Sequence, residues 1–383
     1  MQEFIYYNPK ELDFPLSEEI LVTTNIEDTK EKNFLISNTK EVQSELNASE
    51  IDFYVNNSQD SVSAKIENVL KLYEIAASKY DFAQDISYSE EISKQLLLVA
   101  DNQEDYEAFT EAINDDDFEL FFVKEEMIKE ISGHIGNLSV VVDDEGKDVT
   151  LNVSQIVWFD AKQIGLNQSG TFDPNLTSIE EVVQTLKENI NEYSYKKFTT
   201  YDQSICQYHE RREEICSKCE EVCPTVAITK DDETKTLGFS QIDCHGCGGC
   251  VSVCPSGAIY YAPSNKESLF EISKFYEETH PLVVPEKMEI GTLQTPLKEN
   301  VLPFAIEGEK FLHEGSFLTL LQISGSQVIF YSDFISKGSG DAIRIVNDIY
   351  QAKYGKDAIL VAMNEEELQV ALNEVSFIEG SQF

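Results

Sequence analysis

The feature that most constrains this chain is a block of cysteines in which one short segment occurs twice. All eight cysteines of the 383 residues fall between Cys206 and Cys254. A single shift of the sequence superimposes three cysteines and a proline, placing Cys216 on Cys247, Cys219 on Cys250, Cys223 on Cys254 and Pro224 on Pro255. Such a repeat predicts two copies of one supersecondary unit. The remaining cysteines are out of register, because Cys244 aligns with Glu213 and Cys206 lies further upstream.

The second segment, Cys244 to Pro255, has the spacing C-x₂-C-x₂-C-x₃-C-P. On these motifs residues 194–263 resemble the two-cluster bacterial ferredoxins, which implies a ferredoxin-like domain holding two [4Fe-4S] clusters. In that family the fourth cysteine of each run binds the other cluster. Carried over by position, the resemblance implies one cluster on Cys206, Cys216, Cys219 and Cys254. It implies the other on Cys244, Cys247, Cys250 and Cys223.

The residue types around the cysteines suit this chemistry. Thiolates are soft, anionic ligands for iron. Gly246, Gly248 and Gly249 can adopt positive φ, which lets backbone amides turn toward the sulfur atoms. We expect the other matched residues to close and shield the loops, with Pro224 and Pro255 as loop ends and Ile228 and Ile259 as an apolar wall.

Other chemistries also use clustered cysteines. Zinc sites with four cysteines contain C-x₂-C pairs, but they do not require three cysteines in a tight run before a proline, twice. We therefore favour iron–sulfur binding over zinc. Disulfides are disfavoured further, because the N-terminus lacks a secretory signal and a reducing compartment is expected.

Four cationic or titratable side chains inside the block are candidates for tuning a cluster or contacting a partner, namely His209, Arg211, Arg212 and His245. For His245 we favour a solvated loop histidine. For the other three we favour local pairing with the neighbouring glutamates of the loop between Cys206 and Cys216.

The formal net charge of −41 limits the classes of partner. A chain without a basic stripe is not expected to bind nucleic acid. Its field would attract a redox protein partner with a basic docking face, and simple solubility explains the charge equally well. No apolar run is long enough to span a bilayer, so no membrane insertion is expected. The cytoplasm is the expected location.

Residues 1–193 are expected to form a mixed α/β region of one or two subdomains, with a break near residue 90. Strands are predicted at 19–24, 33–37, 51–55, 96–100 and 119–123, and helices at 61–80, near 105–113 and at 178–193. Ser61 or Asp60 is expected to cap the helix over 61–80. Alternation of strands and helices predicts a parallel sheet.

A β-hairpin is predicted from 138–143 and 149–158, because Asp143-Asp-Glu-Gly146 is a turn signal. Trp158, the only tryptophan, is expected to pack in the core. Residues 165–175 are expected to be a loop. The acidic run 115–117 lacks the glycine and terminal glutamate of a calcium loop, so we interpret it as a solvated charge run.

Residues 264–298 are interpreted as a linker with a helix up to His280, followed by irregular chain at Pro281, Pro285 and Pro296. Residues 299–383 predict a βαβαβα unit with a small parallel, doubly wound sheet. Its strands are predicted at 301–306, 327–331 and 358–362, and its helices at 312–322, 341–353 and 365–375. For 337–341 we favour a loop and helix cap over a phosphate cradle.

The last unit loosely resembles the delta subunit of methyl-viologen-reducing hydrogenase, an electron-transfer adaptor. The family's cysteines are absent, because no cysteine follows Cys254. The resemblance therefore implies no metal centre in 299–383.

Together these patterns predict an α/β and α+β multidomain protein with a ferredoxin-like domain at 194–263. The leading functional hypothesis is an electron-transfer protein that acts as a shuttle or subunit of a redox enzyme system. One alternative is a flavin- or nucleotide-dependent oxidoreductase, although no dinucleotide fingerprint or catalytic constellation is present. Another is a redox-sensing accessory protein. No catalytic residue is assigned, and whether the chain is an enzyme is left open.

Overall fold

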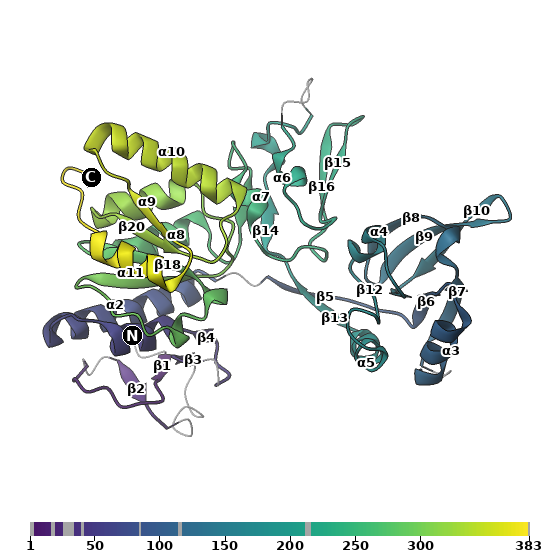
Figure 1. Ribbon diagram of the computed structural model, residues 1–383, viewed down its shortest axis with the longest axis horizontal. Coiled ribbons are helices and arrows are strands. Elements are labelled where there is room, and N and C mark those ends of the chain that lie inside the picture. Colours follow the sequence, from purple (N-terminus) through teal and green to yellow (C-terminus); the bar gives the residue numbers. More distant parts are fainter. Residues whose placement is uncertain are drawn as a thin grey trace. The chain divides into compact units, whose positions relative to one another are not determined.

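The computed structural model describes residues 4–16, 20–25, 34–39, 42–83, 86–113, 117–210 and 216–381. The chain divides into two compact units, and the division passes through the cysteine block. Figure 1 labels helices and strands of both units. Unit 1 comprises residues 1–84, 200–202 and 247–383. Unit 2 comprises residues 85–199 and 203–246. Both units combine helices with strands, as the mixed α/β composition of the sequence predicts.

Unit 1 contains a parallel sheet in the order β19–β18–β20–β21. Its strands are β18 (His280–Pro285), β19 (Val301–Ile306), β20 (Val328–Tyr331) and β21 (Ile359–Ala362). Its helices are α8 (Lys266–Ser273), α9 (Glu314–Ser324), α10 (Lys337–Tyr354) and α11 (Glu365–Glu374). Helix α9 packs against β18 and β20, and α11 packs against β20 and β21. The three strands and three helices predicted after residue 299 are confirmed.

Strand β18 corrects the interpretation of 281–285 as irregular linker. It is fully buried and lies between β19 and β20, where prolines are normally excluded. The backbone N–H of His280 donates to Asn300, on the β19 side, so alternation directs positions 281, 283 and 285 toward β20. Only Leu282 and Val283 are in register with β20, which leaves both prolines beyond that ladder. A segment that contains two prolines thus forms a central strand.

The N-terminal part of unit 1 is a second parallel sheet, β2–β1–β3–β4, followed by two helices. Its elements are β1 (Phe4–Tyr7), β2 (Leu21–Thr23), β3 (Phe34–Ser37), β4 (Leu46–Asn47), α1 (Ser49–Asn57) and α2 (Val62–Asp81). The predictions of strands at 19–24 and 33–37 and of a helix over 61–80 are confirmed. The Ser61 side chain caps α2 by accepting the N–H of Ala64.

Helix α1 shows that the strand predicted at 51–55 is wrong. Ile51, Phe53 and Val55 alternate as in a strand, but the buried residues are Glu50, Ile51, Phe53 and Tyr54, which fit one helical face. This face packs against α2 and β19. The buried Glu50 carboxylate pairs with Lys79 of α2 at 3.1 Å, and Lys79 also donates to the Ala305 carbonyl of β19 at 2.8 Å. Tertiary packing therefore overrides the local strand pattern.

Unit 2 is built on the parallel sheet β12–β11–β6–β7. Its elements up to residue 196 are β5 (Ser87–Glu90), β6 (Gln95–Val99), α3 (Gln103–Ala112), β7 (Glu119–Val123), β8 (Ile128–His134), β9 (Asn137–Asp144), β10 (Lys147–Val153), β11 (Gln155–Trp158), α4 (Gln163–Leu166), β12 (Thr171–Phe172), α5 (Ile179–Asn189) and β13 (Tyr193–Lys196). The parallel sheet and the helix after Ser178 are confirmed.

The central strand β6 is buried on both faces, as expected of a continuous apolar run. Leu96 and Leu98 face a core with α3 and α5 that includes Phe109. Leu97 and Val99 face the opposite core, which the antiparallel sheet β10–β9–β8 covers. Trp158 lies in this second core, and the core-packing prediction for it is confirmed.

The predicted hairpin is present as β9 and β10, but its second arm is shorter than predicted. Residues 149–158 divide at Ser154 into β10 and β11, which belong to different sheets. The N–H of Ser154 donates to Gln95 at 2.9 Å, and its hydroxyl accepts the N–H of Ser93 at 3.2 Å. At these bonds the segment stops pairing with β9, through β10, and starts pairing with β6, through β11. The predicted loop at 165–175 contains the end of α4 and all of β12.

The segment 337–341 also differs from the predicted loop, because these residues form the first turn of α10. Ser336 caps this turn by accepting the N–H of Ser339. Residues 115 and 116 of the acidic run lie outside the described residues. The domain boundaries at 193, 263 and 298 remain predictions. Among the described residues, no helix is long and apolar enough to cross a membrane.

Candidate functional site

The repeat in the sequence is also a repeat in the backbone. Helix α6 (Lys218–Glu221) and helix α7 (Gly249–Ser252) are four-residue helices, and each begins at the second position after a matched cysteine. Strands β15 (Ile228–Asp231) and β17 (Ile259–Tyr261) begin at matched isoleucines. After each helix the cysteine N–H bonds back by three residues, from Cys223 to Glu220 at 3.1 Å and from Cys254 to Val251 at 3.2 Å. Each copy is therefore a short helix, a cysteine and a strand.

The displaced Cys206 has the same local turn as Cys244. The 3₁₀ turn Gln203–Ile205 precedes Cys206, whose N–H donates to Gln203 at 3.3 Å. The N–H of Cys244 donates to Gln241 at 3.2 Å. The sequence signal is Q-x-x-C in both places, and these two cysteines are further apart than the other matched pairs. This alignment of Cys206 with Cys244 was not predicted from the sequence.

The strands around the cysteines pair in a crossed order. Strand β14 (Thr199–Tyr201), which leads into Cys206, pairs with β17, which follows Cys254. Strand β16 (Thr236–Phe239), which leads into Cys244, pairs with β15, which follows Cys223. Equivalent backbone bonds extend the two pairs, from Asp202 N–H to Ala258 at 2.8 Å and from Ser240 N–H to Ala227 at 2.7 Å. Each bond lies four residues before one cysteine and four residues after another.

The second copy is packed against the parallel-sheet part of unit 1. The Lys310 N–H donates to the Cys247 carbonyl at 3.1 Å. Gly248, at the start of α7, has φ +78°, and an added Cβ would lie 2.5 Å from Phe311 Cβ. Gly338 of α10 approaches α7 as closely, because its Cβ would lie 2.2 Å from Ser252 Oγ. Glycines thus allow two close approaches to α7, one of Gly248 to Phe311 and one of Gly338 to the Ser252 side chain.

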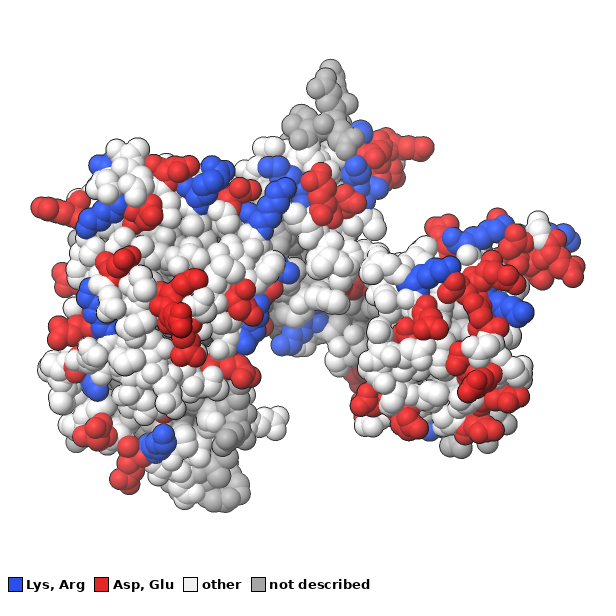
Figure 2. Space-filling view, in the orientation of Figure 1, with Lys and Arg blue, Asp and Glu red and all other residues white. Residues whose placement is uncertain are grey.

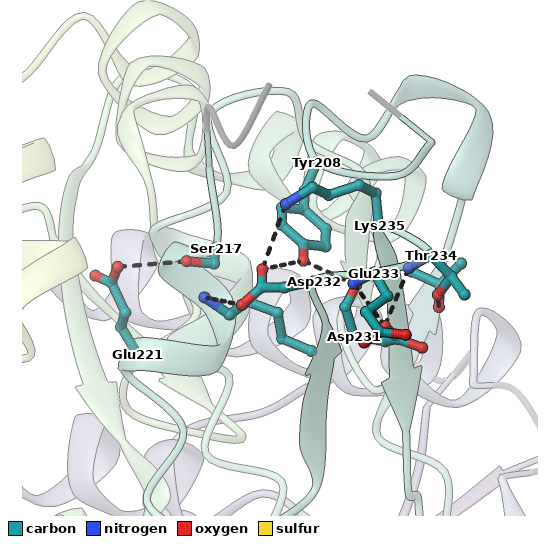
Figure 3. A network of polar contacts seen from close by, with 10 residues as sticks. Tyr208, Ser217, Glu221, Asp231, Asp232, Glu233, Thr234 and Lys235 are labelled. Atoms are coloured by element: carbon teal, nitrogen blue, oxygen red, sulfur yellow. Dashed lines mark hydrogen bonds and ion pairs between the residues drawn. The ribbon is translucent and has the colours of Figure 1, made fainter. Parts of the chain in front are cut away.

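The first copy is anchored by a tyrosine instead (Figure 3). Tyr208 lies in the enlarged loop after Cys206 and is fully buried. Its hydroxyl donates to Asp232 Oδ1 at 2.7 Å and lies 3.1 Å from the Asp231 carbonyl, in the turn of the β15–β16 hairpin. Lys230 and Lys235 flank Asp232 at 3.4 and 3.6 Å. The role of Tyr208 was not predicted. Its only sign in the sequence is that an aromatic residue stands two positions after Cys206.

The hairpin turn that receives Tyr208 is itself ordered by hydrogen bonds. The Asp231 carboxylate accepts the N–H groups of Thr234 and Glu233 at 3.0 and 2.8 Å, and these bonds hold its pKa below the usual value. The Tyr208 hydroxyl and the two lysines hold the pKa of Asp232 below its usual value. Both carboxylates are therefore ionised near neutral pH, that of Asp232 accepting the tyrosine hydroxyl and that of Asp231 ordering the turn.

Backbone N–H groups also point at sulfur atoms. The N–H of Tyr208 donates to Cys206 Sγ at 3.4 Å, and the N–H of Ala258 donates to Cys254 Sγ at 3.2 Å. Cys223 Sγ lies 3.5 Å from the Thr225 hydroxyl. Donors in these positions stabilise a thiolate, and they tune iron–sulfur clusters when thiolates hold them.

The other predicted features divide into confirmed and corrected ones. Gly246 and Gly248 have positive φ, but Gly249 is the first residue of α7 and does not. Ile228 and Ile259 are buried at the starts of β15 and β17. His245 is exposed, which agrees with a solvated loop histidine. Arg211 and Arg212 lie outside the described residues, so their predicted pairing is untested.

The eight cysteines all lie in the described part of the chain, and none is in a disulfide. Cys206 and Cys219 are buried, and the remaining six are partly buried. Across the residues that the structure describes, no three His, Cys, Asp or Glu side chains are gathered closely enough to hold one metal ion. The repeat, the crossed strands and the sulfur-directed donors are all compatible with iron–sulfur binding.

Comparison with known proteins agrees with this chemistry. Residues 214–267 match the family described as the 4Fe-4S dicluster domain. This match includes seven of the eight cysteines and begins after Cys206. A search of curated proteins gave no match. The chain therefore contains an iron–sulfur, ferredoxin-type segment that binds 4Fe-4S and supports an electron-transfer role.

Proposed function

We propose that this protein carries two [4Fe-4S] clusters and serves as a shuttle or subunit of a redox enzyme system. A bound [4Fe-4S] cluster supplies one-electron transfer. The protein would supply thiolate ligands, sulfur-directed N–H donors and the apolar surroundings of Ile228 and Ile259. These are the means by which proteins set the potential of such a group.

The crossed hydrogen bonding is the observation that carries the proposed ligand sets. The Asp202–Ala258 bond ties the chain before Cys206 to the chain after Cys254. Four residues on each side of a fixed bond limit how far these two cysteines can separate. This supports one cluster on Cys206, Cys216, Cys219 and Cys254. The Ser240–Ala227 bond supports the other on Cys244, Cys247, Cys250 and Cys223 in the same way.

The shared turn before Cys206 and Cys244 supports the use of Cys206 as a ligand. In both turns the cysteine N–H donates to the carbonyl of a glutamine three residues earlier. The family match does not reach Cys206, so this turn is the independent argument for it. The enlarged loop then changes the path between Cys206 and Cys216 without changing how the chain approaches the first ligand.

The proposed partner is a redox protein with a basic docking face. Acidic side chains are spread over the surfaces of both units (Figure 2), and the net charge of the chain is −41. Such a field attracts a cationic surface and accelerates the encounter at low ionic strength. Dehydrogenase, hydrogenase and reductase systems all use carriers of this kind, and the partner's chemistry would decide among them.

The proposal is tested by anaerobic purification with iron and acid-labile sulfide assays and by EPR after reduction with dithionite. We expect about eight irons and about eight sulfides per chain and signals of two interacting reduced clusters. Zinc in place of iron would overturn the proposal. Iron for one cluster alone would restrict it to a single site.

The ligand sets are tested by replacing Cys206 and Cys244, separately, with alanine. Each variant should lose the iron of one cluster and keep most of the other, and the two variants should differ in which EPR signal remains. Equal loss of both signals in both variants, with the fold retained by circular dichroism, would contradict the grouping.

A further inference from the structure

A cavity of about 250 Å³ lies within unit 1, beside the second cysteine copy. Its walls come from the chain around β17, from α8 and from the start of α9. Val251 and Ile259, which flank the loop of Cys254, form part of the wall. The volume lies below the roughly 300–1,000 Å³ of sites for drug-sized ligands, so we restrict the occupant to one or two rings.

The cavity is walled mainly by aromatic and aliphatic side chains. Tyr260, Tyr261, Phe270 and Phe311 all line it. Tyr261 and Phe311 stack on each other with ring centroids 4.6 Å apart and planes at 14°, so they present a rigid, flat wall. Flat aromatic surfaces favour planar ligands, which can stack without much loss of conformational entropy.

Lys266 supplies the cationic group of the cavity. It lies at the start of α8 and has no carboxylate partner among the described residues, whereas Lys274, just after the same helix, pairs with Glu271 at 2.6 Å. Its ammonium group lies 4.6 Å from the centroid of the Tyr260 ring. It also lies near the loop after Cys254, because a Cβ on Gly257 would be 3.2 Å from Lys266 Nζ. A cation in this position is available to an anionic ligand.

His313 supplies a hydrogen-bond donor on the other wall. Its Nδ1 accepts the N–H of Gly315 at 3.0 Å and so caps α9. The proton of the neutral ring must then be on Nε2, which can donate to a ligand. Burial lowers the pKa of His313, and the nearby Lys266 lowers it further against the opposing charge of Glu314, so the ring is neutral at pH 7.

We propose that this cavity binds a small planar aromatic carboxylate. The aromatic walls would stack on the ring system, Lys266 would pair with the carboxylate, and His313 Nε2–H would donate to it. A charge-assisted bond in a largely apolar site is the strongest polar contact available to such a ligand. Binding would neutralise Lys266 close to the Cys254 loop. The site would thereby connect ligand concentration to the environment of the second cysteine copy.

The test is isothermal titration calorimetry of the full-length protein with naphthalene-2-carboxylate and, separately, with the neutral naphthalene-2-carboxamide. The carboxylate should bind at least about tenfold more tightly than the amide. Lys266→Gln should abolish this preference, and Lys266→Arg should retain most of it. Phe270→Ala, which alters a half-exposed side chain, should weaken both ligands.

A matched control is Lys353→Gln, because Lys353 is an exposed lysine of unit 1 that does not line the cavity. It should leave both affinities unchanged. No binding of the carboxylate up to millimolar concentration would overturn the inference, as would equal binding by the wild type and Lys266→Gln. The measurement does not depend on cluster content, so a failure here leaves the proposed electron-transfer function intact, and the reverse also holds.

Discussion

The two cysteine copies have the same backbone and different supports. The first copy is held by a side chain, because Tyr208 reaches from the loop after Cys206 to the β15–β16 turn. The second copy is held by close packing at glycines, because Gly248 and Gly338 permit α7 to approach Phe311 and α10. A shared ligand pattern therefore does not imply shared sensitivity to mutation. The two copies should fail through different residues, and the following experiments separate them.

The largest difference is expected at the residue that precedes each short helix. Gly248→Ala adds a Cβ at φ +78° and against the Phe311 backbone, which should lower the free energy of unfolding by about 2–4 kcal/mol. Ser217→Ala, at the equivalent position of the first copy, removes only a hydroxyl that lies 3.4 Å from Glu221. Urea denaturation measures both. Similar losses in the two variants would contradict the difference in support.

Low pH should lower the stability of unit 1, which contains most of the second copy. His280 of β18 is buried against Ser326 and Phe377, and burial lowers its pKa to about 4. The unfolded chain binds this proton near pH 6.5 and the folded chain does not, so stability falls as pH drops from 6.5 toward 4. The loss at pH 5 should be about 2 kcal/mol.

This pH effect is measured as the difference between the wild type and His280→Gln, because the many carboxylates contribute equally to both proteins. The difference in the free energy of unfolding should shrink as pH falls from 7 to 5. Parallel pH profiles for the two proteins would show that His280 does not control this part of the acid response.

A smaller effect is expected from Tyr208→Phe. The variant keeps the ring and the N–H directed at Cys206 but loses the hydroxyl that bonds Asp232, which should destabilise the first copy by about 1–2 kcal/mol. Cluster release during mild denaturation should then affect one EPR signal first. Tyr260→Phe in β17 is the control and should leave the order of release unchanged.

The smallest expected effect is a change in one carboxyl pKa. In Tyr208→Phe the pKa of Asp232 should rise toward its usual value, because its strongest hydrogen bond is lost. The pKa of Asp231 should remain low, because the backbone N–H of Thr234 is its main cause. NMR titration of the side-chain carboxyl carbons tests both groups in one experiment. Equal shifts in the two residues would indicate a general rearrangement of the turn.

The comparison also shows what the sequence can predict. The cysteine repeat predicted the equivalence of α6 with α7 and of β15 with β17, because ligand spacing and the following Cys-Pro step constrain the local backbone. The supports were not predictable in this way. Gly338 and Phe311 are distant in sequence from Gly248, and only tertiary packing brings them to α7.

Elsewhere, prediction from local pattern failed where burial overrode it. Pro281 and Pro285 indicated irregular chain, but a central strand accommodates them beyond its short ladder with β20. Residues 51–55 alternate like a strand, but the segment forms a helix whose buried Glu50 pairs with Lys79 of α2. In contrast, the strands and helices after residue 299 were predicted well, because their periodicity is long and uninterrupted.

The crossed pairing of strands has a consequence for how this segment can vary in length. Cys206 precedes Cys216 by ten residues, whereas Cys244 precedes Cys247 by three. Because β14 fixes the chain before Cys206 from outside the loop, the longer connection adds only about 1 kcal/mol of loop-closure entropy. The interval between Tyr208 and Cys216 is therefore a tolerant insertion point, where new residues can be added without moving the turn that precedes Cys206.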